Sequence, residues 1–109
     1  MPGSPTVVTE QELADPEDAK LATLAKSARA RTAAAEAAAV RDETGRTYVA
    51  ATVALPSLRL TALQAAVAQA VSSGVSALEA AVVLTDAATV DDQVVRDLSA
   101  DAPVYVVRP

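Results

Sequence analysis

The chain has 109 residues, enough for one compact domain. The chain has nine Lys and Arg and fourteen Asp and Glu. The resulting net charge of −5 argues against nucleic acid or an anionic membrane as the main partner. Because the chain contains no Cys and no His, its composition excludes disulfides, thiolate nucleophiles, imidazole bases and Cys/His zinc sites. Only Asp and Glu oxygens remain as metal ligands, a set that suits Mg²⁺ or Ca²⁺, and we expect no cofactor.

The apolar residues are mostly small. There are 27 Ala, 16 Val and 10 Leu, with no Ile, Phe or Trp. An Ala-rich core buries little area, so oligomerisation is a plausible further source of stability in so small a chain. No apolar run is long enough to cross a membrane and no secretion signal is recognisable, so we expect a cytoplasmic protein.

The N-terminal part divides into a tail and a helix. Residues 1–12 contain Pro, Gly, Ser and Thr and are predicted to form a flexible tail, and residues 13–109 a single domain. Asp15 is a good N-cap residue, and Pro16 fits the first helical position. The helix that follows has an apolar stripe formed by Leu21, Leu24, Ala25 and Ala28.

The next stretch allows two interpretations. Residues 33–40 are nearly all Ala, so the first helix could continue through residue 39. A polar turn at residues 41–46 and a β-rich segment at residues 47–53 favour a hairpin instead. An Ala-rich strand makes sense only in the buried middle of a sheet, where small side chains let helices approach closely.

A second helix is predicted after a break at Pro56 and Ser57. Thr61 and Gln64 have capping-box spacing, and residues 72–74 supply a C-terminal stop. The apolar stripe of this helix consists of Leu63, Ala66, Val67, Ala70 and Val71.

The remainder predicts a strand, a third helix and a last strand. Residues 78–84 are almost continuously apolar, which is typical of a strand covered on both faces. Thr89 and Asp92 again have capping spacing, and Val90, Val94 and Leu98 share one helical face. The predicted order is α-β-β-α-β-α-β, with strands at residues 37–40, 49–53, 80–84 and 104–107 in one mixed sheet. Helical crossovers predict parallel pairing among the last three strands, in a layered α/β sandwich.

This order and several short segments resemble the small single-domain cytidine deaminases. That family has a hairpin with an Asp/Glu-Gly-Arg turn, then N-V-E-N-x-S-x-G-L-T, a zinc-binding helix start C-x-E, and later P-C-x-x-C at another helix. The resemblance extends from Leu21 to the C-terminus. The matching residues are Glu43, Thr44, Gly45 and Arg46 in the turn, Val53, Ser57, Leu60 and Thr61 before the helix, and residues 93–98 at the last helix.

The resemblance implies a layered cytidine deaminase-like fold. The zinc ligands and the proton-shuttling Glu of that family have no counterparts in this chain. Zinc deaminases activate water on a metal held by three His or Cys ligands, with a Glu that shuttles the proton. A gapless comparison places Leu63, Ala88 and Asp91 at the ligand positions and Ala65 at the proton-shuttle position. Shifting the helix by one residue places Ala62 at the first ligand position and Gln64 at the proton-shuttle position. In the gapless comparison, the two residues that bind the ribose in the family correspond to Thr52 and Ala54.

The remaining polar residues allow other chemistry. Asp86, Asp91 and Asp92 form the best carboxylate cluster, either as acids at a helix start or as a Mg²⁺ or Ca²⁺ site. Ser57 and Thr61 have no His to activate them, which favours turn and cap roles over nucleophilic ones.

Lone charges in apolar surroundings leave two further questions open. Arg46 and Arg59 could flank a remnant pocket and hold an anion, or simply be solvated. Glu36 and Glu79 indicate either exposed strand ends and edges or buried acids.

These observations predict a catalytically inactive cytidine deaminase-like protein with a structural, oligomerising or small-ligand-binding role. The alternatives are a nucleoside-binding protein and a true cytidine deaminase. A remnant pocket would be lined by Thr52, Ala54, Ser57, Thr61 and Leu63. We expect a dimer or tetramer formed through the second helix, because residues 62–71 carry no charge.

Overall fold

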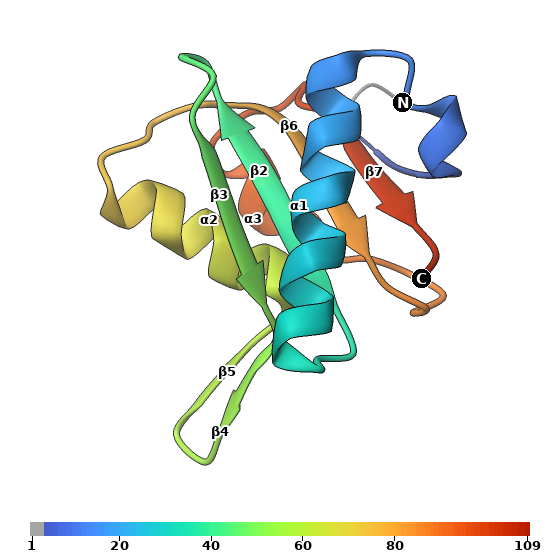
Figure 1. Ribbon diagram of the computed structural model, residues 1–109. Helices are drawn as coiled ribbons and strands as arrows, with labels where there is room; N and C mark the ends of the chain where they lie inside the picture. Colours follow the sequence, from blue (N-terminus) through green and yellow to red (C-terminus); the bar gives the residue numbers. More distant parts are fainter. Residues whose placement is uncertain (1–3) are drawn as a thin grey trace.

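The computed structural model describes residues 4–109 as one mixed sheet with helices on both faces (Figure 1). The sheet has the strand order β1-β7-β6-β2-β3. Helix α1 covers one face, and α2 and α3 cover the other (Figure 1). In chain order the elements are β1 (Pro5–Val8), a 3-10 turn (Glu10–Glu12), α1 (Pro16–Thr32), β2 (Ala37–Asp42), β3 (Thr47–Ala51), β4 (Val53–Leu55), β5 (Leu58–Leu60), α2 (Ala62–Ser72), β6 (Leu78–Leu84), α3 (Gln93–Arg96) and β7 (Val104–Val107).

The predicted α/β architecture is confirmed, with two misassigned residues in the four predicted strands. Strands β2, β3, β6 and β7 overlap these four. Thr52 and Val53 were predicted to end the second of them, but β3 ends at Ala51. Val53 instead begins β4, which pairs with β5 in a separate two-stranded hairpin. The sequence break predicted at Pro56 and Ser57 is the turn of this hairpin.

The Ala-rich segment is a central strand and does not extend α1. β2 pairs antiparallel with β3 on one side and with β6 on the other, and all six of its residues are buried. Its alternate side chains enter two cores, with Ala38 and Val40 facing α2, and Ala37 and Ala39 facing α1. Small side chains on both faces of β2 let both helix layers pack close to the sheet.

Helix α1 begins as its sequence predicts. The Asp15 side chain accepts a hydrogen bond from the Glu17 N–H at 2.9 Å, and Pro16 occupies the first helical position. The helix ends at Thr32, and the C-cap residue Ala33 adopts a left-handed conformation with φ 54°. Leu21 and Ala25, from the predicted stripe, are fully buried against the sheet.

Residues 5–12 were predicted to belong to a flexible tail, and the structure places a strand and a 3-10 turn there; residues 1–3 lie outside the described residues. Pro5–Val8 pairs parallel with Val104–Val107 as an edge strand of the sheet. The short 3-10 turn Glu10–Glu12 then leads to Leu13, which is buried beside α1. A strand of the sheet therefore lies before the predicted boundary at Leu13.

The crossovers differ in detail from the prediction. β6 pairs parallel with β7 as expected, but β3 does not pair with β6, because β2 lies between them. Helix α3 has only four residues, and its N-cap Asp92 makes no side-chain capping bond. Val95 is the fully buried residue of α3, whereas Val90, Val94 and Leu98 are partly buried around it.

No helix within residues 4–109 combines the length and the apolar character that crossing a membrane requires. The cytoplasmic location expected from the sequence stays a prediction.

Candidate functional site

The start of α2 is held by the capping box that the sequence predicts. The Gln64 N–H donates to Thr61 Oγ1 at 3.1 Å, and the Thr61 N–H donates to Gln64 Oε1 at 2.9 Å. The Thr61 hydroxyl oxygen therefore satisfies a helix N–H that would otherwise lack an intrahelical partner. This geometry supports the cap role over the nucleophile role for Thr61.

Leu63 lies one residue inside this helix and faces a small hollow. The hollow has a volume of about 50 Å³, and Leu63 is only 1% exposed. This volume accommodates a few water molecules, whereas sites for drug-sized ligands measure about 300–1,000 Å³. The lining residues come from the start of α2, from β6, and from the segments before β2 and α3. They are Glu36, Thr61, Leu63, Val83, Thr89, Val90 and Asp91.

The carboxylate of Glu36 is bound to the protein itself. Its Oε2 accepts a hydrogen bond from Thr85 Oγ1 at 2.8 Å, and Thr85 Oγ1 accepts one from the Ala87 N–H at 3.0 Å. Thr85 is buried and Glu36 half-buried. The sequence offered an exposed end or a buried acid for Glu36. In the structure Glu36 is half-buried, and its bond to Thr85 holds the loop that follows β6.

A second hollow, of about 270 Å³, adjoins the first and shares Thr61 with it. It brings together Thr52, Ala54 and Thr61 from the predicted remnant pocket, while Leu63 lines only the smaller hollow. Ser57 was predicted to line the pocket but is an exposed residue of the β4–β5 turn and lines neither hollow. The lining of the second hollow is Thr52, Val53, Ala54, Arg59, Leu60, Thr61 and Gln64.

The two arginines expected near this pocket are separated. Arg59 lines the second hollow. Arg46 precedes the first residue of β3, whereas Thr52 follows its last, so the whole strand lies between Arg46 and the hollow. Of the two alternatives left open by the sequence, a place beside this pocket therefore holds for Arg59 and not for Arg46.

The three aspartates do not form a metal site. Asp91 Oδ1 accepts from the Gln93 N–H at 3.0 Å, and Asp92 Oδ2 pairs with Arg96 Nε at 2.9 Å. Within the described part of the chain no three Asp or Glu side chains gather as a metal-binding group. These contacts support the interpretation of Asp91 and Asp92 as acids at a helix start.

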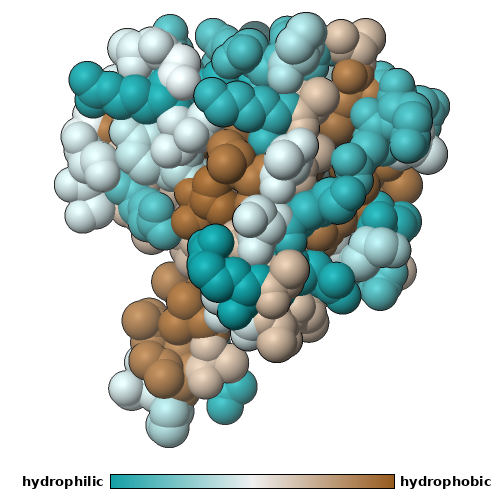
Figure 2. All heavy atoms as spheres, viewed as in Figure 1, coloured by the Kyte–Doolittle hydropathy of each residue, from teal (hydrophilic) through white to brown (hydrophobic). Residues whose placement is uncertain are grey.

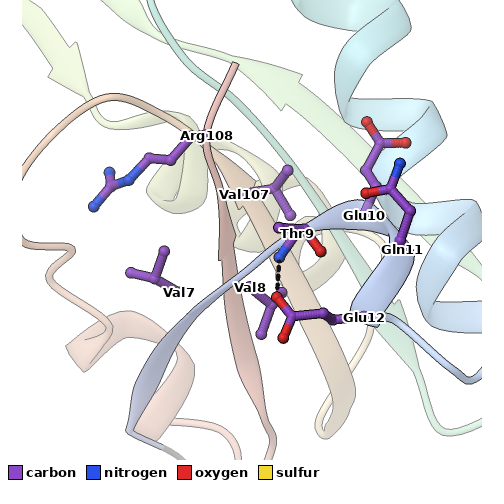
Figure 3. Close-up of a pocket in the computed structure, with 8 residues that line it drawn as sticks. All are labelled: Val7, Val8, Thr9, Glu10, Gln11, Glu12, Val107 and Arg108. Atoms are coloured by element: carbon purple, nitrogen blue, oxygen red, sulfur yellow. Dashed lines mark hydrogen bonds between the residues drawn. The ribbon is translucent and has the colours of Figure 1, made fainter.

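Another hollow, of about 380 Å³, lies on the α1 side beside β1 and the 3-10 turn (Figure 3). The Glu12 carboxylate accepts from the Thr9 N–H at 2.8 Å, and this bond and the Thr9 hydroxyl lower the pKa of Glu12. The Arg108 side chain extends away from Glu10 and Gln11 (Figure 3), and its Nη1 donates to the Thr85 and Ala87 carbonyls. No acid–base pair is assembled among the eight residues that line this hollow.

The residues at the predicted zinc-ligand positions and at the predicted proton-shuttle position, Ala65, do not all meet in one hollow. Leu63 and Asp91 line the same small hollow, and Ala65 is buried on α2. Ala88 is exposed and lines a different hollow beside Pro5, Val7 and Arg108.

A family model described as cytidine deaminase-like matches residues 14–109, almost the whole chain. The chain belongs to the cytidine deaminase-like family. The five-stranded mixed sheet with helices on both faces agrees with this assignment. Curated proteins were also compared, and none matched.

The residues at the positions that the resemblance assigns to the zinc site do not suit a zinc ion. Of Leu63, Ala65, Ala88 and Asp91, only Asp91 carries a side-chain atom that can bind a metal. Leu63, Val83 and Val90 line the small hollow together with the polar residues Glu36, Thr61, Thr89 and Asp91.

Proposed function

We propose that this cytidine deaminase-like protein is not a deaminase and acts as a structural, oligomerising module. The observation that carries the proposal is the burial of Leu63 at the start of α2. Its side chain is 1% exposed and lines a hollow of about 50 Å³, at the place where the family resemblance puts the first zinc ligand. A leucine offers no lone pair to a metal, and the hollow is too small for a nucleoside.

The polar groups around Leu63 support the same proposal. The Thr61 hydroxyl caps α2, and the Glu36 carboxylate is hydrogen-bonded to the buried Thr85. General acid–base catalysis needs a group within hydrogen-bond reach of the reacting proton. Here the Thr61 hydroxyl and the carboxylates of Glu36 and Asp91 are hydrogen-bonded within the chain.

A nucleoside-binding role is the second candidate, and the larger hollow favours it. The hollow of about 270 Å³ combines the hydroxyls of Thr52 and Thr61 with the cationic side chain of Arg59. These groups could hydrogen-bond a sugar or an anionic ligand without any reaction following. Because Leu63 does not line this hollow, binding there is compatible with the absence of catalysis.

Ammonia release from cytidine, measured with and without added Zn²⁺, tests the first candidate, with an active deaminase as positive control. We expect no ammonia above background and no zinc in an elemental analysis of the purified protein. Catalysed ammonia release, or one tightly bound zinc per chain, would overturn the proposal. The Leu63→Ala variant enlarges the hollow, and we expect it to lose stability without gaining activity.

Titration with cytidine followed by NMR separates the two candidates. If the larger hollow binds nucleosides, the backbone signals of Thr52 and Thr61 will shift on titration, and Arg59→Ala will abolish the shifts. The structural role predicts no saturable shifts in either protein.

A further inference from the structure

The outer edge of the sheet, formed by β1 and β7, borders a loop on the α2 side. Side chains alternate between the two faces of a strand, and Val104 of β7 belongs to the core on the α2 side whereas Val107 belongs to the core on the α1 side. By this alternation Val106 and Arg108 face the α2 side, as does Val7, the partner of Val106 on β1. Helix α3 has only four residues, and residues 87–90, in the loop before it, adjoin these side chains.

A hollow of about 270 Å³ lies between this edge and the loop, and we call it the edge hollow. Six of its eight lining residues have aliphatic side chains, and the two others are Thr89 and Arg108. Among the aliphatic ones, Val106 is buried, whereas Val7 is 57% exposed. The volume lies just below the about 300–1,000 Å³ of sites for drug-sized ligands, so the edge hollow suits a smaller molecule with an apolar body.

Arg108 brings a positive charge to the edge hollow. Its Nη1 donates to the main-chain carbonyls of Thr85 and Ala87 at 3.0 Å and 2.6 Å, which fixes the guanidinium and leaves the N–H groups of Nε and Nη2 for a ligand. None of the ion pairs among the described residues includes Arg108, so no carboxylate of the chain neutralises its charge. Figure 3 shows its side chain on the side of Val7 and away from Glu10.

We propose that the edge hollow binds a small carboxylic acid with an apolar body, its carboxylate on Arg108 and its body against Val7 and Val106. A guanidinium binds a carboxylate through two parallel N–H···O bonds, and Nε and Nη2 lie on one side of the group to make them. The apolar body displaces water from the aliphatic lining, which a bare inorganic anion does not do. Ligands of open α/β sheets bind beyond the carboxyl ends of the strands, and parallel β6 and β7 both end at this hollow.

The edge hollow is distinct from the site on which the proposed function depends. It shares Thr89 and Val90 with the small hollow at the start of α2, but neither Thr61 nor Leu63 lines it. Binding of a carboxylic acid here therefore neither requires nor excludes a structural role for the rest of the chain.

The β4–β5 arm is the other exposed apolar surface. Leu55 and Leu58 at its tip are 54% and 48% exposed, and Figure 2 shows the arm as a largely apolar projection. A projection does not enclose a small molecule, and no charged side chain lies at this tip. Val7, in contrast, borders a hollow that also contains a cation, and this combination specifies an anionic ligand with an apolar part.

The first test is an NMR titration with benzoate to about 10 mM, since so small a ligand binds weakly. We expect saturable shifts of the backbone signals of Val7, Ala88 and Val106. Benzamide keeps the ring without the charge, and acetate keeps the charge without the ring. We expect each to bind at least tenfold more weakly than benzoate. The absence of saturable shifts with benzoate, or equal affinity for benzoate and either analogue, would overturn the proposal.

Substitutions then place the ligand. We expect Arg108→Gln to weaken benzoate binding at least tenfold, whereas Arg59→Gln makes the same change at an exposed arginine of another hollow and should have no effect. If Arg108→Gln disturbs the loop, Ala88→Phe fills the edge hollow from an exposed position and leaves Arg108 in place. Ala100→Phe, at another exposed alanine, is its control.

The outcomes of these substitutions separate a ligand site from a structural arginine. We expect Ala88→Phe to abolish the benzoate shifts and Ala100→Phe to keep them. Benzoate binding that survives both Arg108→Gln and Ala88→Phe, or that only Arg59→Gln weakens, would overturn the assignment to the edge hollow. If Arg108 served only to hold the loop, Arg108→Gln would lower the thermal stability and the natural chain would not bind benzoate.

Discussion

Arg41 Nη2 lies 3.0 Å from Asp18 Oδ1, joining the central strand β2 to the first turn of α1. Arg41 is 4% exposed and Asp18 7%. A second carboxylate, that of Glu79 on β6, lies 2.8 Å from Arg41 Nε but is itself largely exposed. Burial acts to lower the pKa of Arg41, but the hydrogen bonds and charges of Glu79 and Asp18 outweigh it and raise the pKa. The guanidinium thus stays charged while it links three elements of the fold.

The two carboxylates of this cluster are expected to differ in their contribution to stability. Asp18→Ala leaves a buried charge on Arg41 without its buried partner, so we expect a loss of about 3–5 kcal/mol in the free energy of unfolding. Glu79→Ala removes a solvent-exposed partner, and its cost should be about 1 kcal/mol or less. Urea denaturation of both variants measures the difference. Equal losses would contradict the larger contribution to stability that we expect from the buried Asp18.

Asp42 is expected to make stability depend on pH. Its Oδ1 accepts from the Thr44 N–H, the Thr44 hydroxyl and the Arg46 N–H at 2.8–3.0 Å. Burial acts to raise the pKa of Asp42, but these bonds and the Arg46 charge lower it below its ordinary value. A depressed pKa stabilises the fold above the unfolded-state pKa of about 3.9, and this contribution is lost as the pH falls through the folded-state pKa.

Asp42→Asn keeps an acceptor oxygen but removes this titration. We therefore expect the difference in unfolding free energy between the natural chain and Asp42→Asn to be constant above about pH 5 and to shrink below about pH 4. Urea titrations between pH 2.5 and pH 7 measure it. A difference that does not change with pH would contradict the role given to the Asp42 charge.

The capping box of α2 offers a direct test of a feature predicted by spacing alone. Thr61→Ala removes the oxygen that accepts from the Gln64 N–H, and we expect a loss of about 1 kcal/mol. Thr61→Ser keeps the oxygen and should cost less. Thermal unfolding followed by circular dichroism compares the two. If both variants lost the same stability, the hydroxyl would not be the contributing group.

Local signals made much of this fold predictable. The Asp15-Pro16 helix start, the Thr61–Gln64 capping box and the Gly45 turn each depend on residues close in sequence, and the structure contains all three. The Ala-rich β2 was predictable because a polar turn and a β-rich segment follow it. Periodicity then placed the apolar face of α1, and that of α2 except for Val71, which was predicted to belong to it but is exposed.

Contacts between distant residues were not predictable in this way. The bond between Thr85 and Glu36 joins residues 49 positions apart, and neither residue carries a local sign of the other. The hairpin turn at Pro56 and Ser57 gave the same signal as a simple break in the chain. The Pro- and Gly-containing N-terminus indicated a tail, because the partner that makes Pro5–Val8 a strand lies at the other end of the sequence.

The N-terminal strand β1 is expected to contribute to the stability of the fold. Deleting residues 1–9 removes all of β1 and exposes the outer edge of β7, together with the apolar side chains that Val8 partly covers in the α1-side core. Each backbone hydrogen bond contributes about 0.5–1.5 kcal/mol, so the loss of a four-residue strand should lower the free energy of unfolding by about 2–4 kcal/mol. Urea denaturation measures the loss, and a deletion of residues 1–3, which leaves β1 intact, is the control for length. A chain shortened by nine residues that kept its full stability would show that the folded unit does begin near Leu13.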